Sequence, residues 1–337
     1  MPFKFQGWLS LLAIALALPV FAQDSGAEPA AAPGEAAPFV APSVSIKPRK
    51  SMMEPKAAQA LMLGLADSGK HLFAVGDWGE ILVSNDGASW AQVETPVRSP
   101  LTAVTFVDDK NGWAVGHDAV VLHTGDGGKT WLLQNFQPEL EKPFLDVLFL
   151  DATHGFAIGA YGLFDETTDG GASWNEVDPP AITADGLHLY KIIKLGNGDL
   201  FIAGEQGLLG MSTDAGKTWK KLDSIYEGTF FGATPVGASG VLVCGLRGNA
   251  FYTPDDRAPK WTKIDTQTTD SMFACHDIDD SHAVMVGLNG KILLTDLSTA
   301  SVSVIRSPVE TAYSAVLPWG KYFVLAGESG VKRVSAQ

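Results

Sequence analysis

The sequence predicts an all-β protein, a seven-bladed β-propeller built from four-stranded antiparallel blades. An apolar strand that ends in glycine recurs every 40 to 45 residues, at Gly76, Gly116, Gly159, Gly204, Gly245, Gly287 and Gly327. This is the repeat length of a four-stranded propeller blade. A second glycine follows three residues later in six of the seven repeats, with Ala119 as the exception. The glycine pair predicts a tight turn between the second and third strands of each blade.

A second repeated feature is a corner built on aspartate, best seen at residues 212–219, Ser-Thr-Asp-Ala-Gly-Lys-Thr-Trp. The short carboxylate can accept hydrogen bonds from turn amides, and the glycine can adopt positive φ. The tryptophan opens the next strand with a large apolar side chain. Each corner follows a third strand, so we expect it to join strands three and four. The residues with this structural role are Asp86 and Trp90, Asp126 and Trp131, Asp169 and Trp174, Asp214 and Trp219, and, in a longer and divergent copy, Asp255 and Trp261.

The N-terminal region differs from the repeats and predicts export. Residues 1–22 carry Lys4, an apolar core from Trp8 to Leu18, and small residues up to Ala22. This order is typical of a secretory signal peptide cleaved after Ala22, with an uncleaved membrane anchor as the alternative. Residues 23–42, rich in alanine and proline, predict a disordered tether. Residues 43–337 are then the propeller, in the periplasm or another extracytoplasmic compartment.

The last repeat supplies only three strands, at 313–317, 322–326 and 331–334. Residues 43–48 resemble other fourth strands, such as 90–95, and are predicted to complete blade seven. Such closure would remove an exposed sheet edge. The alternative is a ring closed without strand exchange. The best candidate for a helix is Glu54–Leu63, although its tail is equally compatible with a strand.

Composition excludes some classes of function and favours a basic partner. The formal net charge is −14, and no basic stripe is present that could neutralise phosphates or anionic lipid. A partner with a basic surface, or no strong electrostatic partner, fits this charge better. Cys244 and Cys275 fall at similar positions along the strands of neighbouring blades, so a disulfide between them is one alternative. Two buried free thiols are the favoured alternative. No Cys-x-x-Cys or His-x-x-x-His pair occurs, so neither metal nor cofactor is predicted.

The aspartate corners resemble the Asp-box (BNR) repeats of sialidase-type propellers. Together with seven repeats and the Gly-x-x-Gly turns, residues 43–337 resemble the photosystem II stability and assembly factor family and its relatives in non-photosynthetic bacteria. That resemblance implies an exported seven-bladed propeller that binds other proteins during assembly of membrane complexes, and we expect the protein to be a monomer without enzymatic activity. In photosynthetic members the partner is a reaction-centre subunit. Two alternatives stay open: a sialidase-type glycoside hydrolase, and a propeller that binds a glycan or small molecule without catalysis.

The sequence carries no catalytic pattern that supports the hydrolase. Sialidases of this fold hold the substrate carboxylate with three arginines, one of them within Arg-Ile-Pro. None of the six arginines here is followed by Ile-Pro, and the nearest string is Ile-Arg-Ser-Pro at 305–308. The corner carboxylates are explained by their own turns. We therefore predict no catalytic residue.

The glycine turns are the predicted binding surface. Alternating strand direction places them on one face and the aspartate corners on the other. One dipeptide per blade lies between the glycines and varies while the glycines recur, as expected of functional loops on a rigid scaffold. Tryptophan, tyrosine and arginine are residue types that anchor interfaces. The residues expected to contact a partner are Asp77, Trp78, His117, Asp118, Tyr161, Glu205, Gln206, Arg247, Asn289 and Glu328. The alternative is a solvated acidic rim with a few aromatic residues partly buried between blades.

Overall fold

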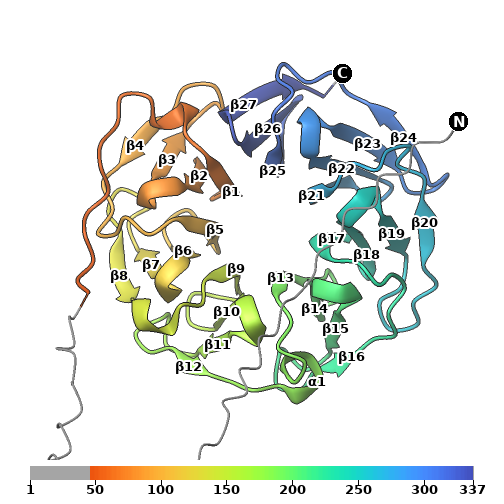
Figure 1. Cartoon of the computed structure of the whole chain (residues 1–337), viewed down its shortest axis with the longest axis horizontal. Coiled ribbons are helices and arrows are strands. Elements are labelled where there is room, and N and C mark those ends of the chain that lie inside the picture. Colours follow the sequence, from red (N-terminus) through yellow and green to blue (C-terminus); the bar gives the residue numbers. More distant parts are fainter. Residues whose placement is uncertain (1–45, 337) are drawn as a thin grey trace, which may run out of the picture. The chain divides into compact units, whose positions relative to one another are not determined.

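A computed structural model describes residues 46–336, which form a ring of seven antiparallel sheets around a central channel (Figure 1). The prediction of a seven-bladed all-β propeller is confirmed. Blade one contains β1 (Met62–Asp67), β2 (Leu72–Gly76), β3 (Ile81–Ser84) and β4 (Ala91–Val93). Blade two contains β5 (Leu101–Phe106), β6 (Gly112–Gly116), β7 (Val121–Thr124) and β8 (Leu132–Asn135). Blade three contains β9 (Phe144–Phe149), β10 (Gly155–Gly159), β11 (Phe164–Thr167) and β12 (Asn175–Glu176).

The remaining blades repeat this order. Blade four contains β13 (Leu189–Lys194), β14 (Leu200–Gly204), β15 (Leu209–Ser212) and β16 (Lys220–Lys221). Blade five contains β17 (Phe230–Val236), β18 (Gly240–Gly245), β19 (Ala250–Thr253) and β20 (Thr262–Ile264). Blade six contains β21 (Met272–Asp279), β22 (His282–Gly287), β23 (Ile292–Asp296) and β24 (Ser301–Val304). Blade seven contains β25 (Tyr313–Trp319), β26 (Tyr322–Gly327) and β27 (Gly330–Ser335).

The second strand of each blade is the most deeply buried. All five residues of β2, β6, β10 and β14 are buried. Each of these strands lies between two strands of its own sheet, and the adjacent blades cover both faces of that sheet. Such double burial explains the continuous apolar runs that end at the seven recurring glycines from Gly76 to Gly327, which we call the landmark glycines. The outer strands are short and exposed, and β16 consists of two lysines, residues that discourage pairing of a sheet edge with another chain.

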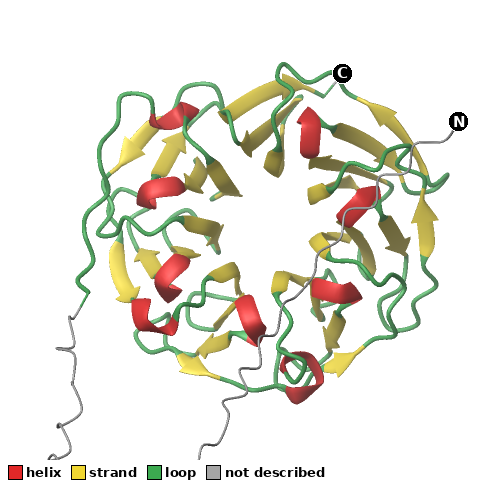
Figure 2. Ribbon diagram, viewed as in Figure 1, coloured by secondary structure: helices red, strands yellow, loops and turns green. Residues whose placement is uncertain are grey.

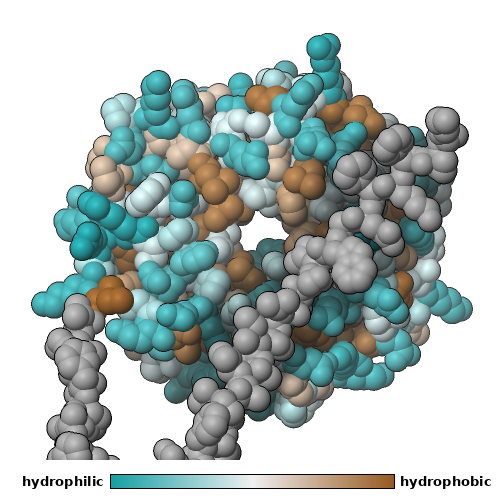
Figure 3. Space-filling view, in the orientation of Figure 1, coloured by the Kyte–Doolittle hydropathy of each residue, from teal (hydrophilic) through white to brown (hydrophobic). Residues whose placement is uncertain are grey.

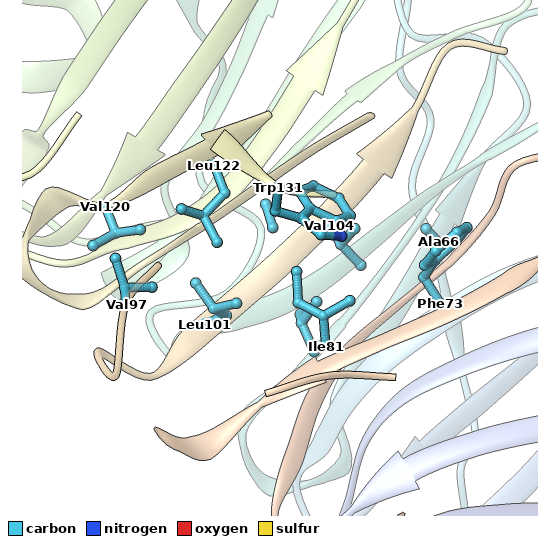
Figure 4. Packing of buried hydrophobic residues seen from close by; sticks show 11 residues of the cluster. Ala66, Phe73, Ile81, Val97, Leu101, Val104, Val120, Leu122 and Trp131 are labelled. Atoms are coloured by element: carbon cyan, nitrogen blue, oxygen red, sulfur yellow. The ribbon is translucent and has the colours of Figure 1, made fainter. Parts of the chain in front are cut away.

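The hydrophobic core is divided among the contacts between adjacent blades. Figure 4 shows one such contact, where Phe73 and Ile81 of blade one meet Leu122 and Trp131 of blade two. Phe73 stacks on Phe106 with ring centroids 4.4 Å apart. Each blade is therefore held mainly by the apolar faces that it presents to its two neighbours.

Blades one and seven close the ring by packing face to face. Met62 and Leu72 of blade one lie in one apolar cluster with Val324 and Ala326 of blade seven. Ser314 Oγ also donates a hydrogen bond to Met62 O at 2.7 Å. The ring is thus joined by side-chain packing between the first and last blades.

The predicted closing strand is wrong for the part of it that the structure describes. Residues 46–48 belong to no strand, while residues 43–45 lie outside the described residues. The chain that follows is tied to the outer strand of blade one: Ser51 N donates to Thr95 O at 3.0 Å, and Gln92 Nε2 to Met52 O at 2.7 Å. These long-range hydrogen bonds direct the segment along blade one instead of blade seven.

The helix candidate at 54–63 is reduced to a single turn, η1 (Ala57–Gln59), and its tail begins β1. This turn packs on β27 so closely that a Cβ on Gly330 would lie 2.0 Å from Ala58 O. Two other short helices, η4 (Pro138–Leu140) and α1 (Pro180–Thr183), lie in connections between blades. The predicted signal peptide, residues 1–22, and the tether, residues 23–42, lie outside the described residues. Within residues 46–336 no helix is long and apolar enough to cross a membrane.

Both cysteines are buried and free, as favoured from the sequence. They lie in the apolar cluster between blades five and six, and burial raises the pKa of the Cys244 thiol. The two thiols therefore pack as small apolar groups.

Candidate functional site

The six Gly-x-x-Gly turns and the Gly-x-x-Ala turn of blade two lie together at one end of the ring, and six of these seven turns form a single helical turn (Figure 2). These turns are η2 (Asp77–Gly79), η3 (His117–Ala119), η5 (Ala160–Gly162), η6 (Glu205–Gly207), η7 (Leu246–Gly248) and η8 (Leu288–Gly290). The second variable residue of each is in the left-handed region, with φ from 51° to 59°: Trp78, Asp118, Tyr161, Gln206, Arg247 and Asn289. This conformation costs an L-residue roughly 1–2 kcal/mol, and glycine avoids that cost. Six residues with a strained backbone are therefore held at one end of the molecule.

The flanking glycines are required by close backbone contacts. A Cβ on Gly76 would lie 2.1 Å from Leu61 O, and one on Gly116 would lie 2.0 Å from Pro100 O. The second glycine has positive φ and approaches the connection to the next blade, since a Cβ on Gly79 would lie 2.2 Å from Val97 O. The frame of each turn is thus fixed, and only the two residues inside it are free to vary.

The structure spreads the predicted partner-binding residues around this end, with at least one in every blade. Trp78 is 60% exposed and Tyr161 is 59% exposed. Exposed as well are His117, Gln206, Arg247, Asn289 and Glu328, whereas Asp77, Asp118 and Glu205 are partly buried. Glu205 Oε2 accepts a hydrogen bond from His188 N at 3.1 Å, and Asn289 Nδ2 donates to Asp270 Oδ1 at 2.9 Å. These residues form a rim around the channel and do not converge on one point.

The rim opens into a central cavity of about 950 Å³ between the first strands of the blades. Each first strand contains a β-bulge next to its beginning, and a bulge redirects the side chain of the extra residue. The seven bulged residues all line the cavity: Leu63, Thr102, Leu145, Tyr190, Phe231, Phe273 and Ser314. We did not predict them from the sequence. The feature of the sequence that identifies them is their position, thirteen or fourteen residues before each landmark glycine.

The bulged residues differ between the two sides of the cavity. Tyr190, Phe231 and Phe273 make an edge-to-face series, with ring centroids 5.1 Å and 5.4 Å apart. His188 and Tyr161 extend the series to the rim, with centroids 4.6 Å apart. We call these five residues the aromatic arc. Figure 3 shows hydrophobic side chains on the margin of the central opening.

On the other side of the cavity, hydroxyl groups join neighbouring blades. Thr102 Oγ1 donates to Phe144 O at 2.8 Å, just as Ser314 does to Met62 O. Leucine takes the place of this hydroxyl in blades one and three, and an aromatic ring does so in blades four, five and six. Within the arc the bulges therefore form an apolar wall in place of this link between blades.

The carboxylates of Asp146 and Asp277, which line the cavity, are paired with neighbouring side chains. Lys191 Nζ lies 2.9 Å from Asp146 Oδ1, and Ile192 N donates to Asp146 Oδ2 at 2.9 Å. Burial opposes ionisation of Asp277, but hydrogen bonds from His276 and Thr234 hold the pKa of its carboxyl below the usual value. Burial, assisted by the charge of Glu205, raises the pKa of Tyr190, so its hydroxyl stays neutral. Glu328 also lines the cavity, and its carboxylate accepts only a long hydrogen bond from Ala312 N at 3.4 Å.

The arginines that a sialidase would need lie elsewhere. The cavity lining contains no arginine among the described residues. Arg98 donates to Lys50 O, and Arg333 donates to Asp86 O. Arg257 makes a bidentate pair with Asp199, at 2.6 Å and 2.8 Å, which joins blade five to blade four. Within residues 46–336 no group of three or more potential metal ligands is present.

The aspartate corners occupy the opposite end of the blades. Asp214 Oδ1 accepts from Thr218 N at 2.9 Å, and Asp214 Oδ2 accepts from Thr218 Oγ1 at 2.6 Å. These bonds lower the pKa of Asp214 to about 2, and equivalent bonds from Ser173 do the same for Asp169. Asp86 and Asp126 accept from the backbone N of Ser89 and Thr130, and Asp255 accepts from Arg257 N at 3.0 Å. Blade six has a further corner on Asp296, which sequence reasoning missed because it has neither glycine nor tryptophan.

The corner tryptophans are not equally buried. Trp131 is 5% exposed, while Trp90, Trp174, Trp219 and Trp261 are partly buried against the edges of their clusters. Only Trp131 therefore has the environment of a core aromatic residue.

Comparison with known proteins adds a family to this geometry. The family model described as "Photosynthesis system II assembly factor YCF48" matches residues 82–142 and 133–326. The chain is 34% identical over 91 residues to the chloroplastic photosystem II stability/assembly factor HCF136 of Cyanidioschyzon merolae, which covers 26% of this chain and 20% of that protein. It is 44% identical over 46 residues to the photosystem II assembly lipoprotein Ycf48 of Prochlorococcus marinus, which covers 14% of each. The matched segments thus span a fifth or less of these curated relatives.

Solved structures share the fold over most of the chain. The structure "YCF48 bound to D1 peptide" has a TM-score of 0.66 at 16% identity, and covers 87% of this chain and 98% of that one. YCF48 from Cyanidioschyzon merolae has a TM-score of 0.65 at 17% identity, covering 84% and 97%. The WD40 propeller domain of Doa1 has the same TM-score at 9% identity, covering 85% and 95%. At these identities the likeness establishes the propeller fold alone.

Proposed function

The chain belongs to the photosynthesis system II assembly factor YCF48 family, and from that premise we propose that it is an exported, non-enzymatic propeller that binds other proteins during assembly of a membrane complex. A relative of known structure is described as bound to a D1 peptide. By extension, the partner proposed here is a polypeptide segment of a membrane-complex subunit. The proposed organisation is a signal peptide at 1–22, a tether at 23–42 and a monomeric propeller at 43–337.

The observation that carries this proposal is the set of six residues with positive φ on the glycine turns, five of which are exposed. Glycine would fit the left-handed position without strain, yet the chain has tryptophan, aspartate, tyrosine, glutamine, arginine and asparagine there. Strain that the surrounding structure must offset is typical of functional positions. Trp78, Tyr161 and Arg247 are also of the types that dominate the free energy of protein interfaces. These features support a binding role for the rim.

Binding is a better explanation than hydrolysis for the same geometry. A sialidase needs a convergent arginine cluster beside a tyrosine nucleophile. The side chains of Arg98, Arg257 and Arg333 make hydrogen bonds outside the cavity, as described above. We therefore expect no hydrolysis of a fluorogenic sialoside by residues 23–337, and turnover that saturates with substrate would contradict a non-enzymatic role.

The proposal is tested by affinity capture from solubilised envelope membranes with tagged residues 23–337. We expect the wild-type protein to retain a membrane-complex subunit, and the double variant Trp78→Ala/Arg247→Ala to lose it. Leu132→Ala is the matched control, because Leu132 is 67% exposed but lies on the outer strand β8. Recovery of the same proteins by all three samples, or of none by the wild type, would contradict the proposal.

A further inference from the structure

The aromatic arc is not part of the hydrophobic core. Each of the seven apolar clusters lies between two blades, and Tyr190, Phe231 and Phe273 belong to none of them. All three side chains are partly exposed to the cavity instead. Large aromatic side chains left at a water-filled surface are costly to solvate and mark interaction sites when they gather in one patch.

Packing of the propeller does not require aromatic residues at these positions. The same bulge is filled by leucine in blades one and three, and by threonine or serine in blades two and seven. All seven bulges nevertheless have the same place in the blade. The aromatic side chains of blades four, five and six thus add an apolar surface that the fold can do without.

The size and chemistry of the cavity select the kind of ligand. A volume of about 950 Å³ is at the upper end of the usual range for ligand pockets, ~300–1,000 Å³, and can admit a stretch of polypeptide. The three rings that face the cavity, Tyr190, Phe231 and Phe273, offer only the Tyr190 hydroxyl, whereas a glycan needs several polar partners. An apolar side chain is therefore the group that the arc fits.

The charge beside the arc is negative. Glu205 lies at the rim beside the arc, with its Oε2 3.9 Å from His188 Nε2, and Glu328 lines the cavity. The nearby cation Lys191 is already paired with Asp146. Since the whole chain has a formal charge of −14, a cationic segment would be attracted to this mouth from a distance.

We propose that the mouth of the channel binds an extended segment of the partner in which an aromatic or large aliphatic side chain stands next to a lysine or arginine. The apolar side chain packs on Tyr190, Phe231 and Phe273, and the basic group pairs with Glu205. This inference rests on the proposed function and specifies the part of the partner that the propeller recognises.

The test measures fluorescence anisotropy of a short labelled peptide of serine and lysine with one central phenylalanine. We expect tighter binding of this peptide than of two controls, one with alanine for phenylalanine and one with glutamate for lysine. Phe231→Ser and Phe273→Ser should each weaken binding about tenfold, which corresponds to ~1.4 kcal/mol. Glu205→Gln should weaken it a few-fold and reduce its dependence on salt. Leu132→Ser, which removes an exposed apolar side chain from the outer strand, should change nothing.

A variant that only disturbs the fold is recognised by two measurements. Each variant is compared by thermal melting, and Phe231→Leu, which keeps an apolar side chain, should retain most of the affinity. Equal binding of the phenylalanine and alanine peptides, or full binding by Phe231→Ser, would overturn the proposal. Binding of phosphatidylcholine vesicles in place of the peptide would do the same.

Failure of this inference can be told apart from failure of the proposed function. If Phe231→Ser retains envelope capture while Trp78→Ala/Arg247→Ala loses it, the rim binds the partner and the arc does not. If the peptide binds as expected but the wild-type protein captures nothing from envelopes, the arc is a binding site and the assembly role is wrong.

Discussion

The two ends of the propeller are both made of turns repeated from blade to blade, but they use their side chains in opposite ways. At the aspartate corners the recurring side chains make the turn: Asp214 accepts two hydrogen bonds from Thr218, and Trp131 packs on Phe73 and Phe106. At the glycine turns all but one of the recurring residues are glycine, and the variable residue with positive φ is exposed in five of the six helical turns. Stability is therefore built into the side chains of one end and into the backbone of the other. That division leaves the side chains of the glycine turns free for binding.

The largest expected effect is at a backbone contact of the glycine turns. In Gly116→Ala the new Cβ would meet Pro100 O at 2.0 Å and Leu101 Cα at 2.8 Å, and neither atom can move without separating two strands. We expect a loss of at least about 3 kcal/mol, or failure to fold. Gly125→Ala is the matched control, because its nearest neighbour would be His123 Cε1 at 3.8 Å. Urea unfolding of the two proteins should separate them clearly, and similar midpoints would show that the turn backbone is not constrained.

The next effect tests the side chains of the aspartate corners. Trp131→Ala removes a side chain that is 5% exposed, at a cost of about 3–5 kcal/mol. Trp219→Ala should cost less, because Trp219 is only partly buried and has one edge-to-face contact, with Phe164 at 5.8 Å. Thermal melting should rank these variants in that order. A greater loss from Trp219→Ala would mean that exposure does not decide the contribution of these residues.

Asp165 is a buried carboxylate whose pH dependence should be the reverse of that of the corner aspartates. Asp165 is 6% exposed and its Oδ1 has no hydrogen-bond partner, so burial, aided by the charge of Glu176, raises its pKa to about 6. A raised folded-state pKa stabilises the protein at low pH, and that contribution is lost as pH rises from the unfolded value, about 4, through 6. Asp165→Asn should therefore raise the melting temperature by a few degrees at about pH 8 and change it little near pH 4. Equal effects at both pH values would contradict ionisation as the cause.

The corner aspartates should show the opposite pH dependence. The folded-state pKa of Asp214 is about 2, so its contribution is present above the unfolded pKa, about 4, and is lost as pH falls from there to 2. Asp214→Ala should lower the melting temperature at neutral pH, and the deficit relative to wild type should shrink in acid. A deficit that is constant across this range would show that the carboxylate charge has no part in the corner.

The smallest effect on stability is expected at the rim. Trp78→Ala and Arg247→Ala should each cost less than ~1 kcal/mol, because both side chains are exposed. Trp78→Gly should be at least as stable as Trp78→Ala, since φ of 56° strains alanine and not glycine. If Trp78→Ala unfolds the protein as readily as Trp131→Ala, the rim is part of the core and the division between the two ends is wrong.

The amino-acid sequence by itself determined the repeated parts of this protein. The landmark glycines, the aspartate corners and the strands between them depend on contacts within one blade, which the residues encode at short range. Blade seven shows this well, because its three strands begin within one residue of the predicted positions at Tyr313, Tyr322 and Gly330. Local hydrogen bonding and the need for glycine at close approaches were sufficient to predict these elements.

Only the tertiary structure decided how the blades meet and what faces the channel. The path of residues 50–54 depends on hydrogen bonds to Gln92 and Thr95, some forty residues away, which no local pattern encodes. The exposure of Trp131 and Trp219 differs although both corners end in Gly-Lys-Thr-Trp, because the neighbouring blades supply different contacts. Tyr190, Phe231 and Phe273 read as ordinary strand residues until a β-bulge in each blade turns them inward and the closed ring brings them together. A surface assembled from several blades exists only once the ring has closed, since each blade alone contributes a single side chain to it.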